Sequence, residues 1–154
     1  MHNIIRFSEP HPDGDEFGKL HKISGSKYSC LFDLFEDAFG LFPAQSYPLE
    51  STAALDNDVL QIMSQHPRSE FKKETKNDSK KKWSDESFDI AKQFGYSLKE
   101  GDSPSTEFIL KGEEIVKRQL ALAGYRLSNL ISYMMSKQKG ETEIRNRSYK
   151  RRSK

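Results

Sequence analysis

The residues with the clearest chemical potential are three carboxylates in the stretch CLFDLFEDAFGLF, residues 30–42. Glu36 and Asp37 follow Asp33 by about one helical turn, and side chains three or four positions apart share one face of a helix. Carboxylates on such a face can ligate a metal ion if the face turns inward, and otherwise they form a solvated surface. Phe32 and Glu36 are also four apart, a spacing at which two side chains can hold one ion or pack together.

A second group of acids occurs in HPDGDE, residues 11–16. Its residue types suit a hard cation, but it lacks the regular ligand spacing and final glutamate of a calcium loop, so a solvated turn is the alternative. The four histidines, at positions 2, 11, 21 and 66, are too far apart in sequence to pair on one helical turn. Walker, GxGxxG, CxxC and HExxH motifs do not occur in the sequence.

Composition sets limits on the core and on the class of protein. The 154 residues suit one domain, yet only 34% are hydrophobic, which predicts a small core or one completed by something outside the chain. A net charge of +2 favours no class of partner. A single cysteine excludes a disulfide within the chain, and no apolar run is long enough to span a membrane. The first residues also show no signal-peptide pattern.

Hydrophobic spacing indicates helices joined by loops, so the predicted fold class is all-α. Residues 1–29, rich in Pro and Gly, are predicted to be irregular, with short extended pieces near Ile4 and residues 20–23. Helices are predicted over residues 29–39, 52–65 and 84–94. Ser84 is the expected N-cap of the third helix, and the lysine-rich KKETKNDSKKK before it is expected to be a solvated loop.

The strongest pattern predicts a long helix over residues 104–137, with Ser103 as its N-cap and Pro104 in its first turn. A helix of this length predicts a bundle built around it, with a loop-rich N-terminal part. Gly112 and Gly124 each weaken a helix, so we expect another helix to approach closely at both positions. Six of the last ten residues are basic, and residues 137–154 are predicted to be a disordered tail.

Several motifs occur in order between residues 83 and 135. WSDES carries Trp83, Glu86 and Ser87, while AGYRLSNL carries Arg126 in the long helix. These motifs resemble the W-x-x-E-S and A/G-G-x-R-L-x-x-L segments of the class I zinc-dependent nucleases, the single-strand-specific nucleases of plants and fungi. Upstream, PDGDEFGKLHKI is similar to their G-D-x-G-G-N loop, and CLFDLFED takes the place of their N-L-H-x-L-W-D helix. Residues 1–136 are thus predicted to be a partial domain, resembling the family's C-terminal half.

The resemblance implies an all-α fold, zinc as the cofactor and hydrolysis of phosphodiester bonds in single-stranded RNA and DNA, as in DNA catabolism. In such a site a zinc-bound water attacks phosphorus and zinc stabilises the developing charge. The implied partner is single-stranded nucleic acid, with neither a membrane nor a small-molecule cofactor. Family members are secreted or vesicular, which the N-terminal sequence does not support.

Transfer of the family's zinc ligands, residue by residue, leaves few of them in place. His2 corresponds to one ligand histidine, while Phe32 and Glu36 stand at a ligand histidine and a ligand aspartate. Phenylalanine cannot coordinate zinc, and glutamate extends the carboxylate by a methylene. Asp15 matches the loop's substrate-side aspartate, and Lys19 replaces its asparagine. We therefore expect that this chain does not assemble the family's complete cluster of three zinc ions, and that it cleaves little or no nucleic acid.

Three interpretations remain open at this level. The chain is a truncated or diverged nuclease-family member, a non-catalytic helical module that binds nucleic acid or a partner, or a fragment with exposed helix faces. The second uses the lysine-rich segment and the basic tail, which can contact phosphates without a metal. Two N-glycosylation triplets, beginning at Asn77 and Asn146, lie in segments predicted to be at the surface.

Overall fold

The computed structural model describes residues 5–42, 52–76 and 79–152, and side chains as far as residue 138. Its α-helices are α1 (Leu31–Glu36), α2 (Ala53–Gln65), α3 (Lys80–Gln93) and α4 (Thr106–Arg152). Five short 3₁₀ turns accompany them: η1 (Glu16–Gly18), η2 (Ala38–Gly40), η3 (Arg68–Phe71), η4 (Glu74–Lys76) and η5 (Gly95–Ser97). The described residues form two isolated β-bridges and no β-strand, which confirms the all-α prediction.

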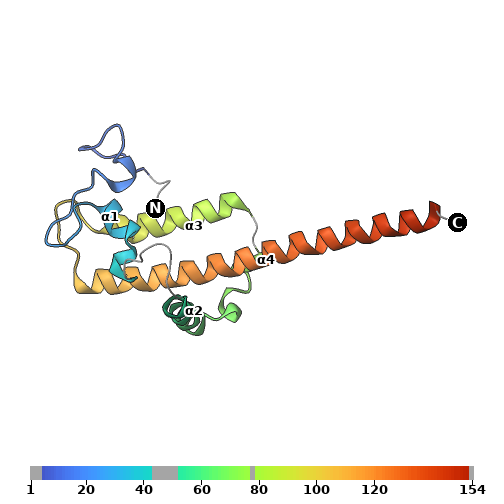
Figure 1. Cartoon of the computed structure of the whole chain (residues 1–154). Helices are drawn as coiled ribbons and strands as arrows, with labels where there is room; N and C mark the ends of the chain where they lie inside the picture. The colour runs from blue at the N-terminus through green and yellow to red at the C-terminus, as the bar shows by residue number, and fades with distance from the viewer. Residues whose placement is uncertain (1–4, 43–51, 77–78, 153–154) are drawn as a thin grey trace.

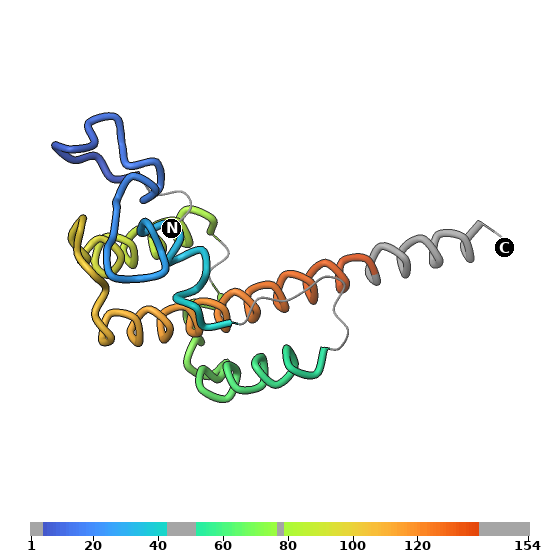
Figure 2. The backbone as a smooth tube through the Cα atoms, turned by 60° about the vertical axis from the view of Figure 1, so that its left-hand side comes forward, coloured from blue at the N-terminus to red at the C-terminus, as the bar shows by residue number. Residues whose placement is uncertain are grey.

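Helix α4 is the axis of the molecule. Helices α2 and α3 lie on different sides of it, while α1 and the N-terminal loop gather around the end where α4 begins (Figures 1 and 2). The rest of α4 extends away from this body (Figure 1). The predicted bundle around one long C-terminal helix, with a loop-rich N-terminal part, is the observed architecture.

Helix α2 agrees closely with its prediction, but α3 begins earlier than expected. The N-cap of α3 is Ser79, whose hydroxyl accepts a hydrogen bond from the Lys82 N–H, and the helix therefore includes Lys80. The predicted cap, Ser84, lies inside α3, and part of the predicted lysine loop is helical. Lysine is a good helix former, so an absence of apolar residues does not prevent a capped helix from forming.

The predicted helix over residues 29–39 is broken after α1. Ala38 and Phe39, in η2, have φ values of 46° and 62°, which non-glycine residues rarely adopt. The turn places the Phe39 ring against α4 in an aromatic group with Phe35, Phe94 and Phe108. Burial of this ring offsets a backbone cost of about 1–3 kcal/mol per strained residue.

Helix α4 differs from its prediction at both ends. Ser105, rather than Ser103, accepts the first capping hydrogen bond, from the Phe108 N–H. At the other end the helix continues to Arg152, through the segment predicted to be a disordered tail from residue 137. The lysine, arginine and glutamate of this segment have high intrinsic helix propensity, and a periodic apolar face is not required for helix formation.

Two apolar clusters hold the elements to α4. One joins Leu31 and Leu34 of α1, both fully buried, to Ile109 and Val116 of α4. The other surrounds the buried Phe71 of η3 and consists otherwise of Ala121, Leu122, Tyr125 and the half-buried Ile62. No helix among the described residues is both long enough and apolar enough to cross a membrane.

The two glycines of α4 have different surroundings. A Cβ added at Gly112 would lie 2.4 Å from the Phe39 ring, so a close approach occurs there, made by a side chain of the short turn η2 rather than by the predicted helix. A Cβ added at Gly124 would meet no atom of the described residues within 4 Å, so the same prediction is wrong for that part of the chain. A weak helix former in a sequence therefore indicated a packing constraint in only one of the two cases.

Candidate functional site

Helix α1 presents the two residues that stand at ligand positions of the family. Leu31 and Leu34 anchor the helix in the core, which leaves Phe32 half-buried and Glu36 exposed at its surface. The two lie one helical turn apart, as the four-residue spacing predicts. The short helix therefore keeps the spacing of the site although one of its two residues has no donor atom.

A lysine covers the ring of Phe32. The ammonium nitrogen of Lys19, which follows η1, lies 5.1 Å from the centroid of that ring. A cation over an aromatic face is attracted by the negative face of the π-system. The same positive charge disfavours a metal cation beside Phe32, because like charges at this range repel. Lys19 and Phe32 thus form a cation–π contact at the position where the resemblance places a zinc ligand.

Asp15 of the N-terminal loop is buried, and both of its carboxylate oxygens accept hydrogen bonds. Only 1% of its surface is exposed. The Tyr96 hydroxyl donates to its Oδ2 at 2.7 Å, and the Arg6 N–H donates to its Oδ1 at 2.9 Å. Burial, and then the hydrogen bond to Asp15, raise the pKa of Tyr96. The carboxylate therefore fastens the N-terminal loop to η5.

A polar cavity of about 230 Å³ lies beside this contact and includes His11, His21 and Glu100 in its lining. His11 pairs with Glu100 at 3.0 Å, while the buried His21 donates from Nε2 to the carbonyl of Leu98 at 3.0 Å. Burial lowers the pKa of His21. His11 and Asp15 of HPDGDE thus contact different partners, as in a structural turn.

The described residues do not fit a zinc cluster. Within residues 5–42, 52–76 and 79–152, no three histidine, cysteine or acidic side chains are arranged to hold one metal ion. Phe32 offers no donor and carries the Lys19 ammonium over its ring, while Glu36 stands on exposed surface. His2 lies outside the described residues. Of the glycosylation candidates, Asn77 also lies outside them, and the backbone at Asn146 belongs to α4.

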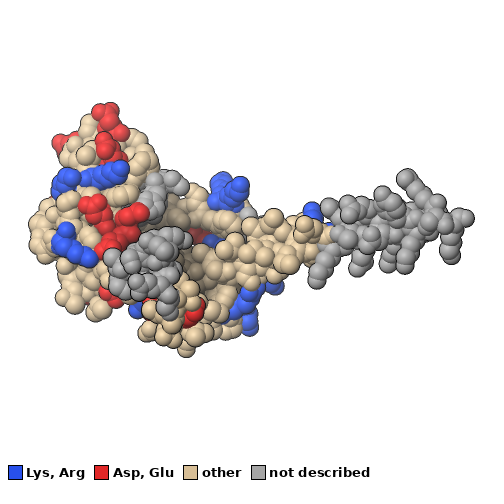
Figure 3. Space-filling model, viewed as in Figure 1, with Lys and Arg blue, Asp and Glu red and all other residues tan. Residues whose placement is uncertain are grey.

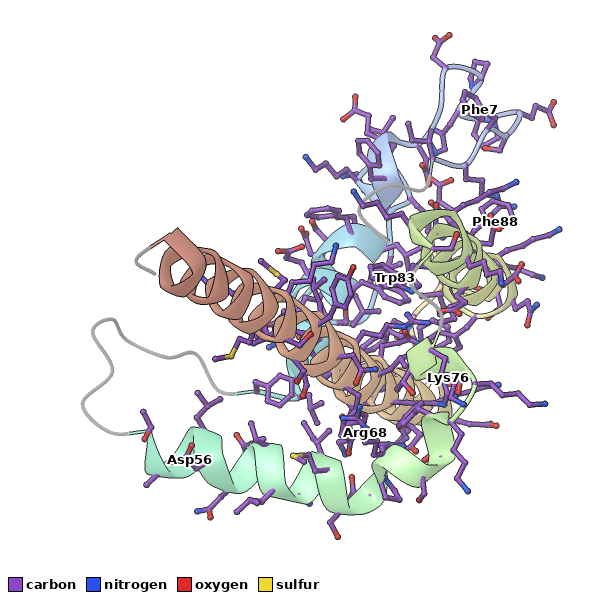
Figure 4. All side chains as sticks on the ribbon, turned by 90° about the vertical axis from the view of Figure 1, so that its right-hand side faces the viewer. Phe7, Asp56, Arg68, Lys76, Trp83 and Phe88 are labelled. Atoms are coloured by element: carbon purple, nitrogen blue, oxygen red, sulfur yellow. The ribbon has the colours of Figure 1, made fainter. Side chains whose placement is uncertain are left out.

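The motif residues of the resemblance meet one another in space. The Arg126 guanidinium donates to both oxygens of Glu86, at 3.0 and 2.7 Å, and lies 5.1 Å from the centroid of the Trp83 ring. Figure 4 shows Trp83 between α3 and α4. These contacts join α3 to α4, so the residues of the motifs that carry the resemblance hold two helices together.

A charged network missed by sequence reasoning ties the segment after α2 to α4. Arg118 of α4 pairs with Glu70 at 3.3 Å and with Glu74 at 2.6 Å. The buried ring of His66 lies 3.4 Å from Glu70 and 3.3 Å from Glu114. The segment QHPRSEF gave no periodic signal, because its partners lie about fifty residues further along the chain.

Comparison with known proteins bears on the family. The family model described as S1/P1 Nuclease matches residues 37–136, about two thirds of the chain. No curated protein and no solved structure matches the chain. The matched span includes Trp83, Glu86 and Arg126 and begins directly after Glu36. The chain belongs to the S1/P1 nuclease family.

Proposed function

We propose that this chain is a diverged, non-catalytic member of the S1/P1 nuclease family. The observation that carries the proposal is the contact between Lys19 and Phe32, since the resemblance places a zinc ligand at Phe32 and a neutral asparagine at Lys19. One substitution removes a donor atom and the other adds a positive charge. Both changes act against a metal cation, whose binding requires donor atoms with negative or partial negative charge.

Two further features support the proposal. Glu36 is exposed on α1, and among the described residues no group of three or more histidine, cysteine or acidic side chains is arranged to hold a metal ion. Asp15 is satisfied by Tyr96 and Arg6, which leaves little of its carboxylate for a substrate. Nuclease activity in the family depends on metal-activated water, so a chain with neither a complete ligand set nor a free substrate-side carboxylate is expected not to cleave.

The test measures zinc content and cleavage together. The purified chain is incubated with zinc, desalted and assayed by mass spectrometry for bound metal, and then with fluorescent single-stranded DNA and RNA for cleavage. We expect less than one zinc per chain and no chelator-sensitive cleavage. The proposal is overturned by stoichiometric zinc together with cleavage, both lost in Glu36→Ala.

A restoration experiment examines the contact directly. Phe32→His with Lys19→Asn returns the family's residue types at both positions, and Phe88→His is the matched control because Phe88 is exposed on α3. We expect the double variant to gain at most weak zinc binding above the Phe88→His level, with no cleavage. Recovery of robust cleavage would show that these two positions alone had silenced an otherwise intact site.

A second candidate function is nucleic-acid binding without cleavage. It is favoured by six exposed lysines around η4 and the start of α3: Lys72, Lys73, Lys76, Lys80, Lys81 and Lys82. Figure 4 shows Lys76 directed away from the body. Lysine contacts to phosphates depend strongly on salt, and about four contacts to a single strand give a log–log slope near −3.

This candidate is tested by fluorescence anisotropy with a single-stranded oligonucleotide over a range of salt. Charge reversal at Lys80, Lys81 and Lys82 is expected to weaken binding at least tenfold. The control reverses Lys99, Lys111 and Lys117, which lie in other parts of the chain. Absence of binding, salt-insensitive binding, or equal loss in the two variants would remove this candidate.

A further inference from the structure

Helix α4 is apolar on two opposite sides between Gln119 and Ser136. One side is buried in the core and includes Ala121, Leu122 and Tyr125. The opposite side is exposed, with exposed fractions of 47–61% for Leu120, Leu127, Leu130, Ile131 and Met134. A helix that is apolar all round is typical of a helix covered all round. The second side of α4 therefore has the composition of an interface.

Charge is nearly absent from this part of α4. Arg126 is the only charged residue between Gln119 and Ser136, and its guanidinium is directed to Glu86 of α3. Figure 3 shows the stretch of α4 that leaves the body as a mainly uncharged surface in this view. A surface without charge can meet an identical surface without like-charge repulsion, which a charged face cannot do.

The exposed side has the spacing of a helix–helix seam. Leu120, Gly124, Leu127, Ile131 and Met134 follow one another at alternating intervals of four and three residues. This is the heptad spacing that keeps one stripe of a helix facing a partner helix. All five residues are exposed. The spacing therefore indicates that the partner that covers this side of α4 is itself a helix.

The two ends of the seam are complementary in shape, because one end is hollow and the other carries a protruding side chain. A groove of about 580 Å³ lies between α2 and α4, with Gly124 and Ser128 in its lining, and is bordered by Leu55, Val59 and Met63 of α2. Gly124 leaves open space where a larger side chain would stand. Ten residues further along the same helix, Met134 protrudes with 61% of its surface exposed. One end of the seam is thus hollow and the other is bulky.

We propose that this seam binds a second copy of the chain with the two α4 helices antiparallel. A two-fold axis near Asn129 would place Met134 of one copy in the hollow at Gly124 of the other, and Leu127 against Ile131. Each contact then occurs twice, as two-fold symmetry requires. A parallel arrangement would instead set hollow against hollow and protrusion against protrusion.

The available area is sufficient for such a dimer. Nine half-exposed apolar side chains border the seam and the groove: Leu55, Val59, Met63, Leu120, Leu127, Leu130, Ile131, Met134 and Met135. Together they offer on the order of 700 Å² per copy, close to the roughly 800 Å² per partner of a standard stable interface. A micromolar dimer is consistent with this area.

The test is sedimentation equilibrium of the full chain between about 5 and 200 µM, with Leu127→Glu and Leu110→Glu as a matched pair. Leu110 is the control because it is a leucine of α4 with a similar exposed fraction, 59% against 56%, but lies outside the seam. We expect the wild type and Leu110→Glu to reach twice the 17.8 kDa chain mass. Leu127→Glu is expected to raise the dissociation constant at least 50-fold, with unchanged circular dichroism.

Orientation is tested by disulfide cross-linking. An equal mixture of Gly124→Cys and Met134→Cys chains is expected to form mixed dimers, while neither variant alone forms many; the native Cys30 is buried. The proposal is overturned if the wild type stays at 17.8 kDa throughout, or if the two glutamate variants associate equally. Preferential cross-linking of Gly124→Cys to itself, or binding to neutral phospholipid vesicles in place of self-association, would also overturn it.

Discussion

Gly112 offers a sharp test of how α4 is held against the N-terminal part of the chain. Its backbone is helical, so alanine at this position should be favourable for the helix itself, by about 1 kcal/mol. The added methyl group, however, would lie 2.4 Å from Cε1 and Cζ of Phe39. Since carbon atoms are in ordinary contact at about 3.5–4.0 Å, the ring or the helix must move by about 1 Å.

The surroundings decide which effect is larger. Phe39 is buried, its backbone is fixed in a left-handed turn, and its ring contacts those of Phe35, Phe94 and Phe108. A ring enclosed in this way cannot swing into solvent, so overpacking is expected to cost about 2–3 kcal/mol. After the gain in helix propensity, Gly112→Ala should lower the free energy of unfolding by about 1–2 kcal/mol.

Gly124→Ala is the matched control, because an added Cβ there meets no atom within 4 Å in the part of the chain that the structure describes. It should raise the free energy of unfolding by up to about 1 kcal/mol. Both changes are measured by urea unfolding, with Trp83 fluorescence, in a Leu127→Glu background that prevents self-association. With a slope of about 2 kcal/mol/M, midpoints should move by roughly 0.5–1 M downward and up to about 0.5 M upward. Equal stabilisation by both alanines would refute the packing of Phe39 against α4.

Three other changes test contacts of the site. Tyr96→Phe removes the hydroxyl that donates to the buried Asp15, and it should lower the free energy of unfolding, measured in urea, by about 2 kcal/mol. An effect below about 0.5 kcal/mol would show that this hydrogen bond contributes little to holding the N-terminal loop. Arg126→Lys loses the donation from Nε to the Glu74 carbonyl while it keeps one cationic nitrogen for Glu86, which Nη2 alone contacts, and it should cost about 1–2 kcal/mol in the same assay. An unchanged midpoint would show that a point charge suffices. Burial lowers the pKa of His21 below its usual 6.5, so the unfolded imidazole takes up a proton first and stability should fall as the pH drops below about 6.5. His21→Gln keeps a donor for the carbonyl of Leu98 but does not titrate, and should flatten that part of the pH profile; an identical profile would contradict the assignment.

The apolar pattern predicted the bounds of α2 well. Helix α2 agrees with its prediction within a residue, because its stripe ends shortly before Pro67. The start of α3 was missed because Ser79 and Ser84 are both acceptable caps and the residues that follow Ser79 are three lysines, Lys80, Lys81 and Lys82. The break at Ala38 was missed for a different reason, since two non-glycine residues adopt positive φ only to bury Phe39.

The relative placement of the candidate residues was predicted in part, while their function stays a prediction. The positions of Phe32 and Glu36 on one turn follow directly from their spacing, and the structure places them so. The Lys19 contact depends on how η1 folds over α1, which no periodicity encodes. Asp15 was expected to face substrate, but in the structure it is buried against Tyr96, eighty-one positions along the chain. Contacts of such long range are set by the fold as a whole and leave no local pattern.

Family membership and chemistry are carried by different residues of this chain. The matched span, residues 37–136, contains the contacts that join α3 to α4, and it excludes both Phe32 and Glu36. Bound metal contributes to folding stability in many metalloproteins, so a domain that loses it must be held by other contacts. Here the hydrogen bond from Tyr96 to Asp15 and the pairing of Arg126 with Glu86 connect the N-terminal loop and α3 to the body through side chains alone. Under our proposal that the chain is non-catalytic, these contacts hold the scaffold, and the α4 seam is the surface at which we expect an interaction.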